Sequence, residues 1–165
     1  SFGSSYFQNK HFLKKLSTLK WTVVEQKHFV EDGKISFTDE HLDFAYQVDD
    51  IPNTDKPHCL LLSSVLQYLE DPDRWLEKFF AYQFPYIIID RTAFINDKQR
   101  LTVQSVPEFI YKASYPCWFF NEDEFLLKFS THYELIADFD SFADPNKVTE
   151  DGKQLYWKGF FFKQK

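Results

Sequence analysis

Two short apolar runs with a capped helix between them constrain the fold most. The run Cys59–Leu62 ends in Ser63-Ser64, and the run Tyr86–Ile89 ends in Asp90-Arg91. Neither run alternates with polar residues, which is typical of strands buried on both faces of a parallel sheet. Between them, Asp71-Pro72 predicts the start of a helix, because aspartate caps helices and proline suits the first helical position. The order strand, helix, strand predicts a parallel βαβ unit.

The same alternation of strands and helices extends over the chain. Strands are predicted at Trp21–Val24, Leu42–Val48, Tyr133–Asp138 and Leu155–Lys163, and the last two could be antiparallel because a polar loop joins them. Asn121 and Glu124 have the spacing of a helix cap. The pattern predicts an α/β fold with a mostly parallel sheet.

The N-terminal region carries a second capping signal. Ser5 and Gln8 have capping-box spacing, and apolar residues then recur at helical intervals from Phe12 to Leu19. We therefore expect a helix that begins at Ser5 and continues through this apolar stretch. The segment 26–40 predicts a short helix ended by Gly33.

Length and composition predict one folded domain over residues 1–165. The chain has 165 residues, which is the size of a single domain, and its 20 Phe, 9 Tyr and 4 Trp supply enough apolar area to exclude disorder. Residues 91–120 show little periodicity and many aromatics. Because a long excursion inside a compact domain is usually functional, we expect this insert to be a lid over an acceptor.

Charge and cysteine content exclude several classes of function. The net charge of −6 disfavours nucleic-acid binding. Two cysteines are too few for a disulfide framework and predict a reducing, cytoplasmic setting. The five histidines show no metal-ligand spacing, so no metal is expected. Apolar runs such as Phe160–Phe162 are far shorter than the roughly 20 residues that a membrane helix needs.

Ligands of open α/β sheets bind beyond the carboxyl ends of the strands, so residues at predicted strand ends are candidates. Glu25 closes one strand 22 residues after Gly3, a spacing suited to contact with ribose hydroxyls; it could also be a surface glutamate. Gly3 suits close backbone approach to a ligand, although the dinucleotide fingerprint is incomplete and a flexible terminus is the alternative.

Polar residues also follow the two buried runs. Ser63 and Ser64 could face a ligand or bond the backbone, and Tyr68 is more often a core aromatic than a catalytic one. Asp90 and Arg91 could pair with each other or face the pocket. Aromatics that could cage a cation or simply pack occur in one stretch: Tyr111, Tyr115, Trp118, Phe119 and Phe120.

Several of these stretches resemble known motifs. Gly3–Ser5, Val24-Glu25 and the run Leu61–Pro72, which reads LLSSVLQYLEDP, are similar to successive motifs of class I S-adenosylmethionine-dependent methyltransferases. The run Tyr111–Phe120, YKASYPCWFF, resembles a bacterial methyltransferase family associated with surface-polysaccharide gene clusters. The resemblance implies a Rossmann-like three-layer sandwich whose mostly parallel sheet has one antiparallel strand near the C-terminus.

The resemblance also implies roles for single residues toward the cofactor S-adenosylmethionine. Gly3 would belong to the glycine-rich loop and Glu25 would hold the ribose diol. Asp49 or Asp50 would lie near the adenine. The methionine end would be met by residues after the buried run Cys59–Leu62: Ser63, Ser64, Gln67 and Tyr68.

One part of the family pattern is missing. The first strand of that fold should precede Ser1 and lie between the strands that end at Glu25 and at Ser63. We therefore expect an N-terminally incomplete methyltransferase-like domain in which two ladders are left open.

The sequence thus predicts an enzyme that transfers a methyl group from S-adenosylmethionine to a small-molecule or sugar-type acceptor. A base is needed only if the acceptor carries a proton to be removed, and the candidates are Asp90, Tyr115 and His58. The alternative is a catalytically silent, methyltransferase-like module that binds a partner protein.

Overall fold

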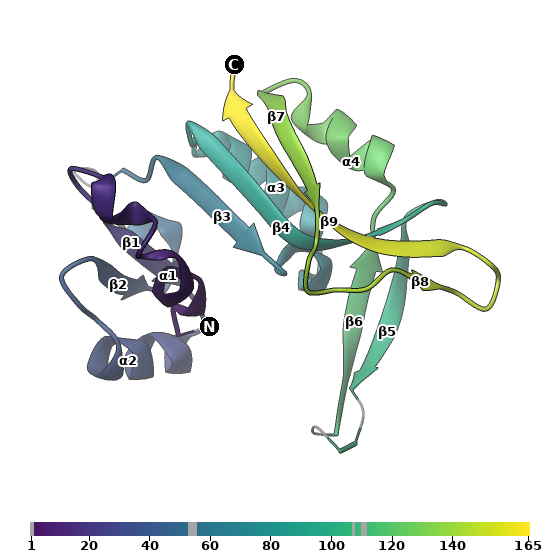
Figure 1. The fold of residues 1–165 in the computed structure, drawn as a ribbon, viewed down its shortest axis with the longest axis horizontal. Helices are drawn as coiled ribbons and strands as arrows, with labels where there is room; N and C mark the ends of the chain where they lie inside the picture. Colours follow the sequence, from purple (N-terminus) through teal and green to yellow (C-terminus); the bar gives the residue numbers. More distant parts are fainter. Residues whose placement is uncertain (1, 53–55, 107, 110–111) are drawn as a thin grey trace. The chain divides into compact units, whose positions relative to one another are not determined.

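The computed structural model describes residues 2–52, 56–106, 108–109 and 112–165. The chain forms two compact units, Ser1–Lys56 and Pro57–Lys165, and each is described by itself. The predicted single domain over 1–165 therefore stays a prediction. Figure 1 shows the elements of both units in sequence colours.

The first unit is built around a two-stranded parallel sheet. Its elements are α1 (Ser4–Asn9), β1 (Trp21–Val24), α2 (Lys27–Ser36) and β2 (Leu42–Ala45). β1 and β2 pair in parallel from Trp21 with Leu42 to Val24 with Ala45. Their core is a small cluster of buried side chains: Tyr6, Val30, Leu42 and Phe44. The Tyr6 hydroxyl donates to Asp39 Oδ2 at 2.9 Å, which ties α1 to the turn before β2.

Both helices of this unit differ from the sequence prediction. α1 ends at Asn9, and Phe12, which was expected on its buried side, is 73% exposed. The apolar spacing failed as a signal because Phe12 and Leu16 stay exposed, while Leu19 packs on the core of this unit from outside a helix. α2 continues past Gly33 to Ser36. A side chain at position 33 would lie 2.6 Å from the Phe44 ring. That glycine therefore serves packing and does not end the helix.

The second unit contains a five-stranded sheet, a separate hairpin and two helices (Figure 1). Its strands are β3 (Cys59–Ser63), β4 (Tyr86–Ile95), β5 (Arg100–Val106), β6 (Ala113–Phe119), β7 (Tyr133–Asp140), β8 (Lys147–Val148) and β9 (Gln154–Gln164). Its helices are α3 (Pro72–Ala81) and α4 (Glu122–Phe129). Both predicted caps are confirmed: Asp71 accepts from the Arg74 N–H at 3.1 Å, and Asn121 accepts from the Glu124 N–H at 3.0 Å.

The larger sheet is mixed, so the prediction of a mostly parallel sheet is wrong. Its order is β3-β4-β9-β7, with β8 on β9, and only β3 and β4 pair in parallel. β9 runs antiparallel to β4, β7 and β8. One antiparallel strand near the C-terminus was expected in an otherwise parallel sheet. Because β9 lies inside the sheet, it makes three of the four pairings antiparallel.

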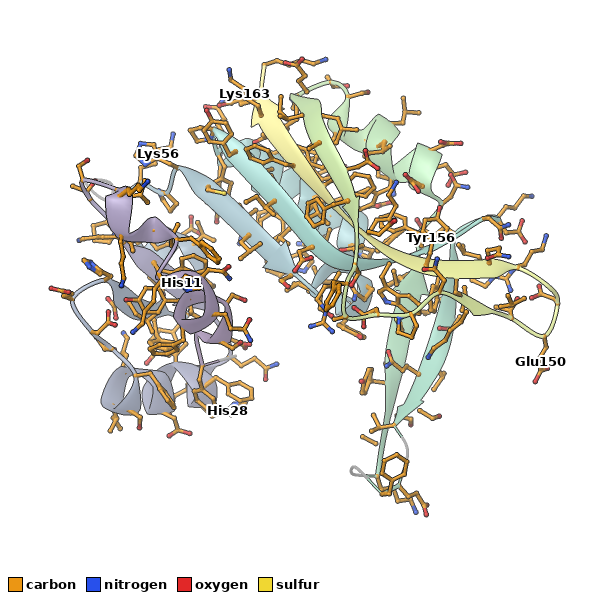
Figure 2. All side chains as sticks on the ribbon, viewed as in Figure 1. His11, His28, Lys56, Glu150, Tyr156 and Lys163 are labelled. Atoms are coloured by element: carbon orange, nitrogen blue, oxygen red, sulfur yellow. The ribbon has the colours of Figure 1, made fainter. Side chains whose placement is uncertain are left out.

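One face of this sheet is covered by both helices and forms the core (Figure 2). Ile87 pairs with Phe162 and Ile89 with Phe160, and all four side chains are at most 1% exposed. The Phe129 ring of α4 stacks on Phe162 with centroids 4.2 Å apart. α3 reaches the same cluster through Phe80, whose ring lies 5.0 Å from that of Phe129. Within this unit the elements therefore form two layers, where the resemblance implied three.

On the opposite face of the sheet the side chains are less covered. Ile88 and Phe161 are only half buried, and Tyr86, stacked on Phe161 at 5.6 Å, is exposed. β1 pairs only with β2, and β3 only with β4, among the residues that the structure describes. The resemblance implied a further strand that would pair with both β1 and β3.

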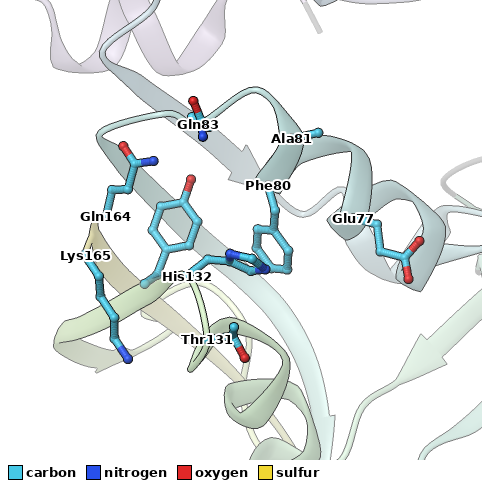
Figure 3. Close-up of a pocket in the computed structure, with 9 residues that line it drawn as sticks. Glu77, Phe80, Ala81, Gln83, Thr131, His132, Gln164 and Lys165 are labelled. Atoms are coloured by element: carbon cyan, nitrogen blue, oxygen red, sulfur yellow. The ribbon is translucent and has the colours of Figure 1, made fainter.

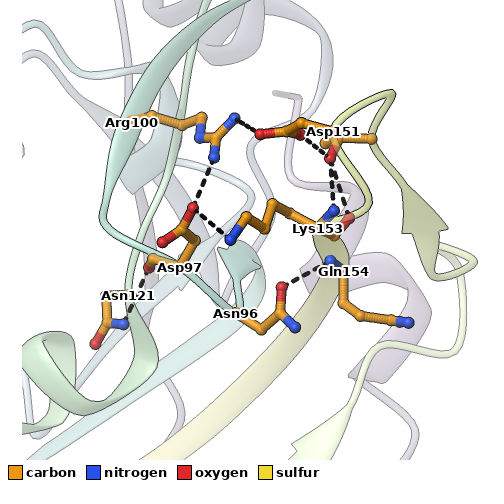
Figure 4. Close-up of polar contacts among 8 residues, drawn as sticks. Asn96, Asp97, Arg100, Asn121, Asp151, Lys153 and Gln154 are labelled. Carbon is orange, nitrogen blue, oxygen red and sulfur yellow. Dashed lines mark hydrogen bonds and ion pairs between the residues drawn. The ribbon is translucent and has the colours of Figure 1, made fainter.

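The predicted insert 91–120 is more regular than its sequence suggested. β4 continues to Ile95, and β5 and β6 pair from Arg100 with Phe119 to Val106 with Ala113. Figure 4 shows how the base of this hairpin is fixed: Asp97 binds both Arg100 and Lys153, and Arg100 also binds Asp151. The apolar residues do not reveal the strand alternation, because Cys117 and Phe119 are buried whereas Leu101 and Val103 are exposed.

Candidate functional site

A cluster of polar groups, called the strand-end cluster, lies at the carboxyl end of β3 and beside it on β4, where the pairing of β4 with β9 has a bulge. Ser63 is paired with Asp90, and its hydroxyl donates to Asp90 Oδ2 at 2.8 Å. The residues that follow these two in the chain, Ser64 and Arg91, have a left-handed backbone with φ of 55° and 51°. This conformation is uncommon for residues with a side chain, and strained residues cluster at functional sites. The two strained residues therefore make this cluster a candidate site.

Gln67 joins these two strand ends from the 3-10 turn Leu66–Tyr68. Its side chain is only 1% exposed, and its amide nitrogen donates to Ser64 Oγ at 3.1 Å and to the Arg91 carbonyl at 3.0 Å. Its amide oxygen, also buried, has no hydrogen-bond partner among the described residues. A buried acceptor without a partner costs about 1–3 kcal/mol, so an unmet acceptor of this kind points to a ligand or an ordered water.

Tyr68 connects the strand ends to the β5–β6 hairpin. Its hydroxyl donates to Gln104 Oε1 at 3.2 Å, and its ring meets the Tyr115 ring edge-on at 5.4 Å. Trp118 adds a bond from its indole N–H to the Leu69 carbonyl at 3.1 Å. Partial burial raises the pKa of Tyr68, so its hydroxyl is protonated at neutral pH. These contacts hold the hairpin beside the cluster at its Gln104–Tyr115 pair.

Arg91 does not pair with Asp90, which was one reading of the sequence. Its Nε donates to Asp144 Oδ2 at 2.9 Å, and its Nη2 donates to Asp144 Oδ1 at 3.3 Å. The hydrogen bonds from this guanidinium lower the pKa of Asp144 despite partial burial, and the Ser141 hydroxyl adds a further bond at 2.9 Å. The segment between β7 and β8 is thereby held at the end of β4.

The remaining cofactor candidates lie in the first unit. Gly3 is buried with φ of 80° directly before α1, and a side chain there would be strained and would come within 3.0 Å of Leu42. Glu25 follows β1, where its N–H bonds the Ala45 carbonyl at 3.1 Å. Burial acts to raise the pKa of Glu25, but hydrogen bonds to the carboxylate, including the Gln26 N–H at 2.9 Å, leave it lowered.

Asp49 and Asp50 lie on the 3-10 turn Val48–Asp50, just after β2. The Asp50 carboxylate is used locally, because it accepts from the backbone and side-chain nitrogens of Gln47 at 3.2 and 3.1 Å. Asp49 is exposed on the same turn. The structure thus places four of the eight predicted cofactor residues in each unit.

Other predicted residues lie away from the cluster. His58 precedes β3, at the opposite end of the strand from Ser63, and is exposed. Burial raises the pKa of Cys117 to about 11, so its thiol is not a reactive nucleophile. Phe119 and Phe120 are buried in the core, which favours packing over a cation cage. Tyr111 lies outside the described residues.

Two pockets open elsewhere on the second unit. One of about 500 Å³ lies between the end of α3 and the start of β7, as Figure 3 shows; Phe80, His132 and Lys165 are among its lining residues. Another of about 450 Å³ lies between α4 and β7. Both lie at the face covered by the two helices, and neither includes a residue of the strand-end cluster.

Two features are not found within the described ranges. No group of three or more histidine, cysteine or acidic side chains there could hold a metal ion. Among the helices in that part of the chain, none is long and apolar enough to cross a membrane.

Comparison with known proteins gives a likeness in structure alone. No family model matches the chain, and no curated protein does. A candidate S-adenosylmethionine-dependent methyltransferase from Listeria monocytogenes matches with a TM-score of 0.56 and 9% identity over 99% of this chain and 89% of that one. An S-adenosylmethionine-dependent methyltransferase from Clostridium acetobutylicum matches with a TM-score of 0.52 and 12% identity over 94% and 78%. The chain has the fold of these methyltransferases.

The residues present fit such a cofactor in chemical terms. S-adenosylmethionine presents an ammonium group and ribose hydroxyls as donors, and the chain offers acceptors at the strand ends. The orphaned Gln67 oxygen is one, and the Glu25 carboxylate, which a lowered pKa keeps ionised at neutral pH, is another. Gly3 leaves its backbone open to close approach, because it carries no side chain.

Three residues of the strand-end cluster were missed by the sequence reasoning. Gln104 lies inside the insert, and Ser141 and Asp144 lie in the polar loop after β7. Nothing in their local sequence marks them, because Gln104 and Asp144 reach the cluster through partners 36 and 53 positions away, and Ser141 joins it through Asp144.

Proposed function

We propose that this protein is an S-adenosylmethionine-dependent methyltransferase acting on a small-molecule acceptor. The observation that carries the proposal is the buried amide oxygen of Gln67, unpaired among the described residues, beside the left-handed residues Ser64 and Arg91 in a chain with a methyltransferase fold. In open α/β sheets ligands bind at this carboxyl edge.

Candidate cofactor residues occur in each unit, and each set is proposed by itself. Glu25 would accept from the ribose diol, with Gly3 giving close backbone approach and Asp49 or Asp50 near the adenine. The methionine end would be met by the strand-end residues: Ser63, Ser64, Gln67 and Tyr68. When bound, S-adenosylmethionine supplies an electrophilic methyl group on a sulfonium.

The protein's own contribution would be positioning. An acceptor held in line at near-attack distance gains much of its acceleration from orientation alone. The base of the β5–β6 hairpin, with Gln104 and Tyr115 fixed on Tyr68, would form the acceptor wall. A saccharide would suit such a wall, because sugars pack on aromatic rings. Asp90 is the base we favour for a hydroxyl acceptor, since Tyr68 and Tyr115 are weak bases and His58 lies at the other end of β3.

Thermal unfolding with S-adenosylhomocysteine tests the proposal directly. Ligand at 100 times its dissociation constant stabilises the folded state by roughly 2.7 kcal/mol. For a domain of this size each kcal/mol raises the melting temperature by about 2–4 °C, so the expected rise is about 5–10 °C.

Two substitutions locate the binding. Glu25→Gln should weaken S-adenosylhomocysteine binding about tenfold or more, because a charge-assisted hydrogen bond is worth about 1.5–3 kcal/mol. Glu31→Gln is the matched control, since Glu31 lies on α2 in an exposed pair with Lys27 at 3.7 Å. No rise in melting temperature for the unmodified chain would reject cofactor binding by it and favour the silent binding module. Equal affinities for the two variants would remove Glu25 from the site.

A further inference from the structure

We propose that Arg91 is the anion-recognising residue of the acceptor site. Its guanidinium would bind a carboxylate or phosphate group of the acceptor, and Asp144 occupies that position in the structure. The inference deepens the proposed function and rests on it, because the bound anion is an acceptor only if the protein is a methyltransferase. The binding of an anion at Arg91 stands on the geometry of the second unit alone.

The contact between Arg91 and Asp144 has the form of a ligand contact. Two guanidinium nitrogens, Nε and Nη2, meet the two carboxylate oxygens at 2.9 and 3.3 Å. A forked pair of this kind recognises any oxyanion with two suitably spaced oxygens, and carboxylates and phosphates both qualify. The side chains are 44% and 26% exposed, so the pair is open to exchange with a solute.

The backbone of Arg91 is held more firmly than a surface ion pair requires. Its φ is 51°, a strained value for a residue with a side chain, and its carbonyl accepts from the buried Gln67 amide at 3.0 Å. The same amide binds Ser64 at 3.1 Å. Arg91 lies at a bulge in the pairing of β4 with β9, and bulges of this kind re-aim side chains next to active sites. The guanidinium is therefore presented from a fixed base beside the strand-end cluster.

The Asp144 side chain has fewer supporting contacts than the Arg91 backbone. It lies on the segment between β7 and β8, which has no helix or strand, and its further side-chain contact is the Ser141 hydroxyl at 2.9 Å. Phe142 in the same segment is fully exposed, so no apolar contact anchors the segment there. A carboxylate on a short tether acts as an internal ligand at an effective concentration in the millimolar range. An acceptor's anionic group could displace it.

The location favours an acceptor over the cofactor's own carboxylate. Arg91 begins the segment 91–120, whose residues Gln104 and Tyr115 contact Tyr68 at the cluster. Asp90, on the neighbouring position, accepts from the Ser63 hydroxyl at 2.8 Å. A cationic group is suited to Asp90, and an anionic group is suited to Arg91.

Nuclear magnetic resonance of the arginine Nε–H groups tests the proposal. The chain has three arginines, Arg74, Arg91 and Arg100, so the Arg91 signal is assigned by its loss in Arg91→Gln. Inorganic phosphate and, separately, acetate are titrated without S-adenosylhomocysteine into the full chain and into Asp144→Ala. We expect the Asp144→Ala variant to bind the better anion at least about tenfold more tightly than the unmodified chain, with saturation at the Arg91 signal.

The double variant Asp144→Ala with Arg91→Gln should lose this gain. Asp151→Ala is the matched control, because it removes a carboxylate from Arg100 at 3.2 Å on the same unit but away from the cluster. Failure of Asp144→Ala to bind more tightly, or an equal gain in Asp151→Ala, would overturn the proposal. Tighter phosphate binding assigns a phosphorylated acceptor and tighter acetate binding a carboxylated one; either supports it.

A separate titration with S-adenosylhomocysteine distinguishes failure of the proposed function from failure of the anion site at Arg91. Arg91→Gln should leave its affinity within about threefold of the unmodified chain. A loss of more than tenfold would assign the guanidinium to the cofactor and overturn the acceptor reading. If no variant binds S-adenosylhomocysteine, the proposed function fails, while the anion titration still decides whether Arg91 is an anion site.

Discussion

Replacing Gln67 by leucine should leave the stability of the protein almost unchanged, although the side chain is 1% exposed and makes two hydrogen bonds. Losing the bonds to Ser64 and to the Arg91 carbonyl costs about 1 kcal/mol each. The substitution also removes the buried amide oxygen that has no partner, which returns about 1–3 kcal/mol. The expected net change in the free energy of unfolding is therefore within about 1 kcal/mol of zero.

Urea unfolding measures this change, and an unchanged slope shows that the same surface is exposed on unfolding. Tyr133→Phe is the matched control: Tyr133 is also buried, and its hydroxyl donates to the Phe84 carbonyl at 3.0 Å. Because that hydroxyl is paired, its loss should cost about 1–2 kcal/mol. A loss above about 3 kcal/mol for Gln67→Leu, and larger than for Tyr133→Phe, would refute the reasoning, since it would mean that the amide oxygen has a partner such as a buried water.

Three further predictions concern charge, packing and reactivity. The Arg91 hydrogen bonds lower the pKa of Asp144, so the pair stabilises the fold fully above the ordinary aspartate pKa of about 4 and less as the pH falls through the lowered value. In thermal melts Arg91→Gln should be less stable than the unmodified chain at pH 7, and the difference should shrink as the pH falls through that lowered value. Gly159→Ala should lower the melting temperature by several degrees, because the new methyl would lie 2.2 Å from an aromatic ring and 2.8 Å from a backbone oxygen. In the folded protein at pH 8 a thiol reagent should modify Cys59 and spare buried Cys117, and equal rates would show that the hairpin base opens.

Local signals in the sequence determined the elements that depend on neighbouring residues. Asp71-Pro72 and Asn121 each begin a helix as predicted, because a cap needs only the next turn of backbone. The runs at Cys59 and Tyr86 form a parallel pair, since strands without polar alternation are stable only inside a sheet. The same reasoning placed Ser63 beside Asp90, because parallel strands end at a common edge.

Long-range packing decided what the sequence could not. The periodicity after Asn9 predicted a longer helix, but a helix persists only where another element buries its apolar side. The antiparallel pairing of β7 with β9 was open to prediction from the polar loop that joins them, whereas the place of β9 between β7 and β4 was not. Asp144 reaches Arg91 across 53 positions, a pairing set by how β7, β8 and β9 fold back. The sequence thus determined the strand-end groups, and the tertiary structure alone decided the partners that complete the candidate site, because contacts between distant segments depend on the whole packing of the sheet.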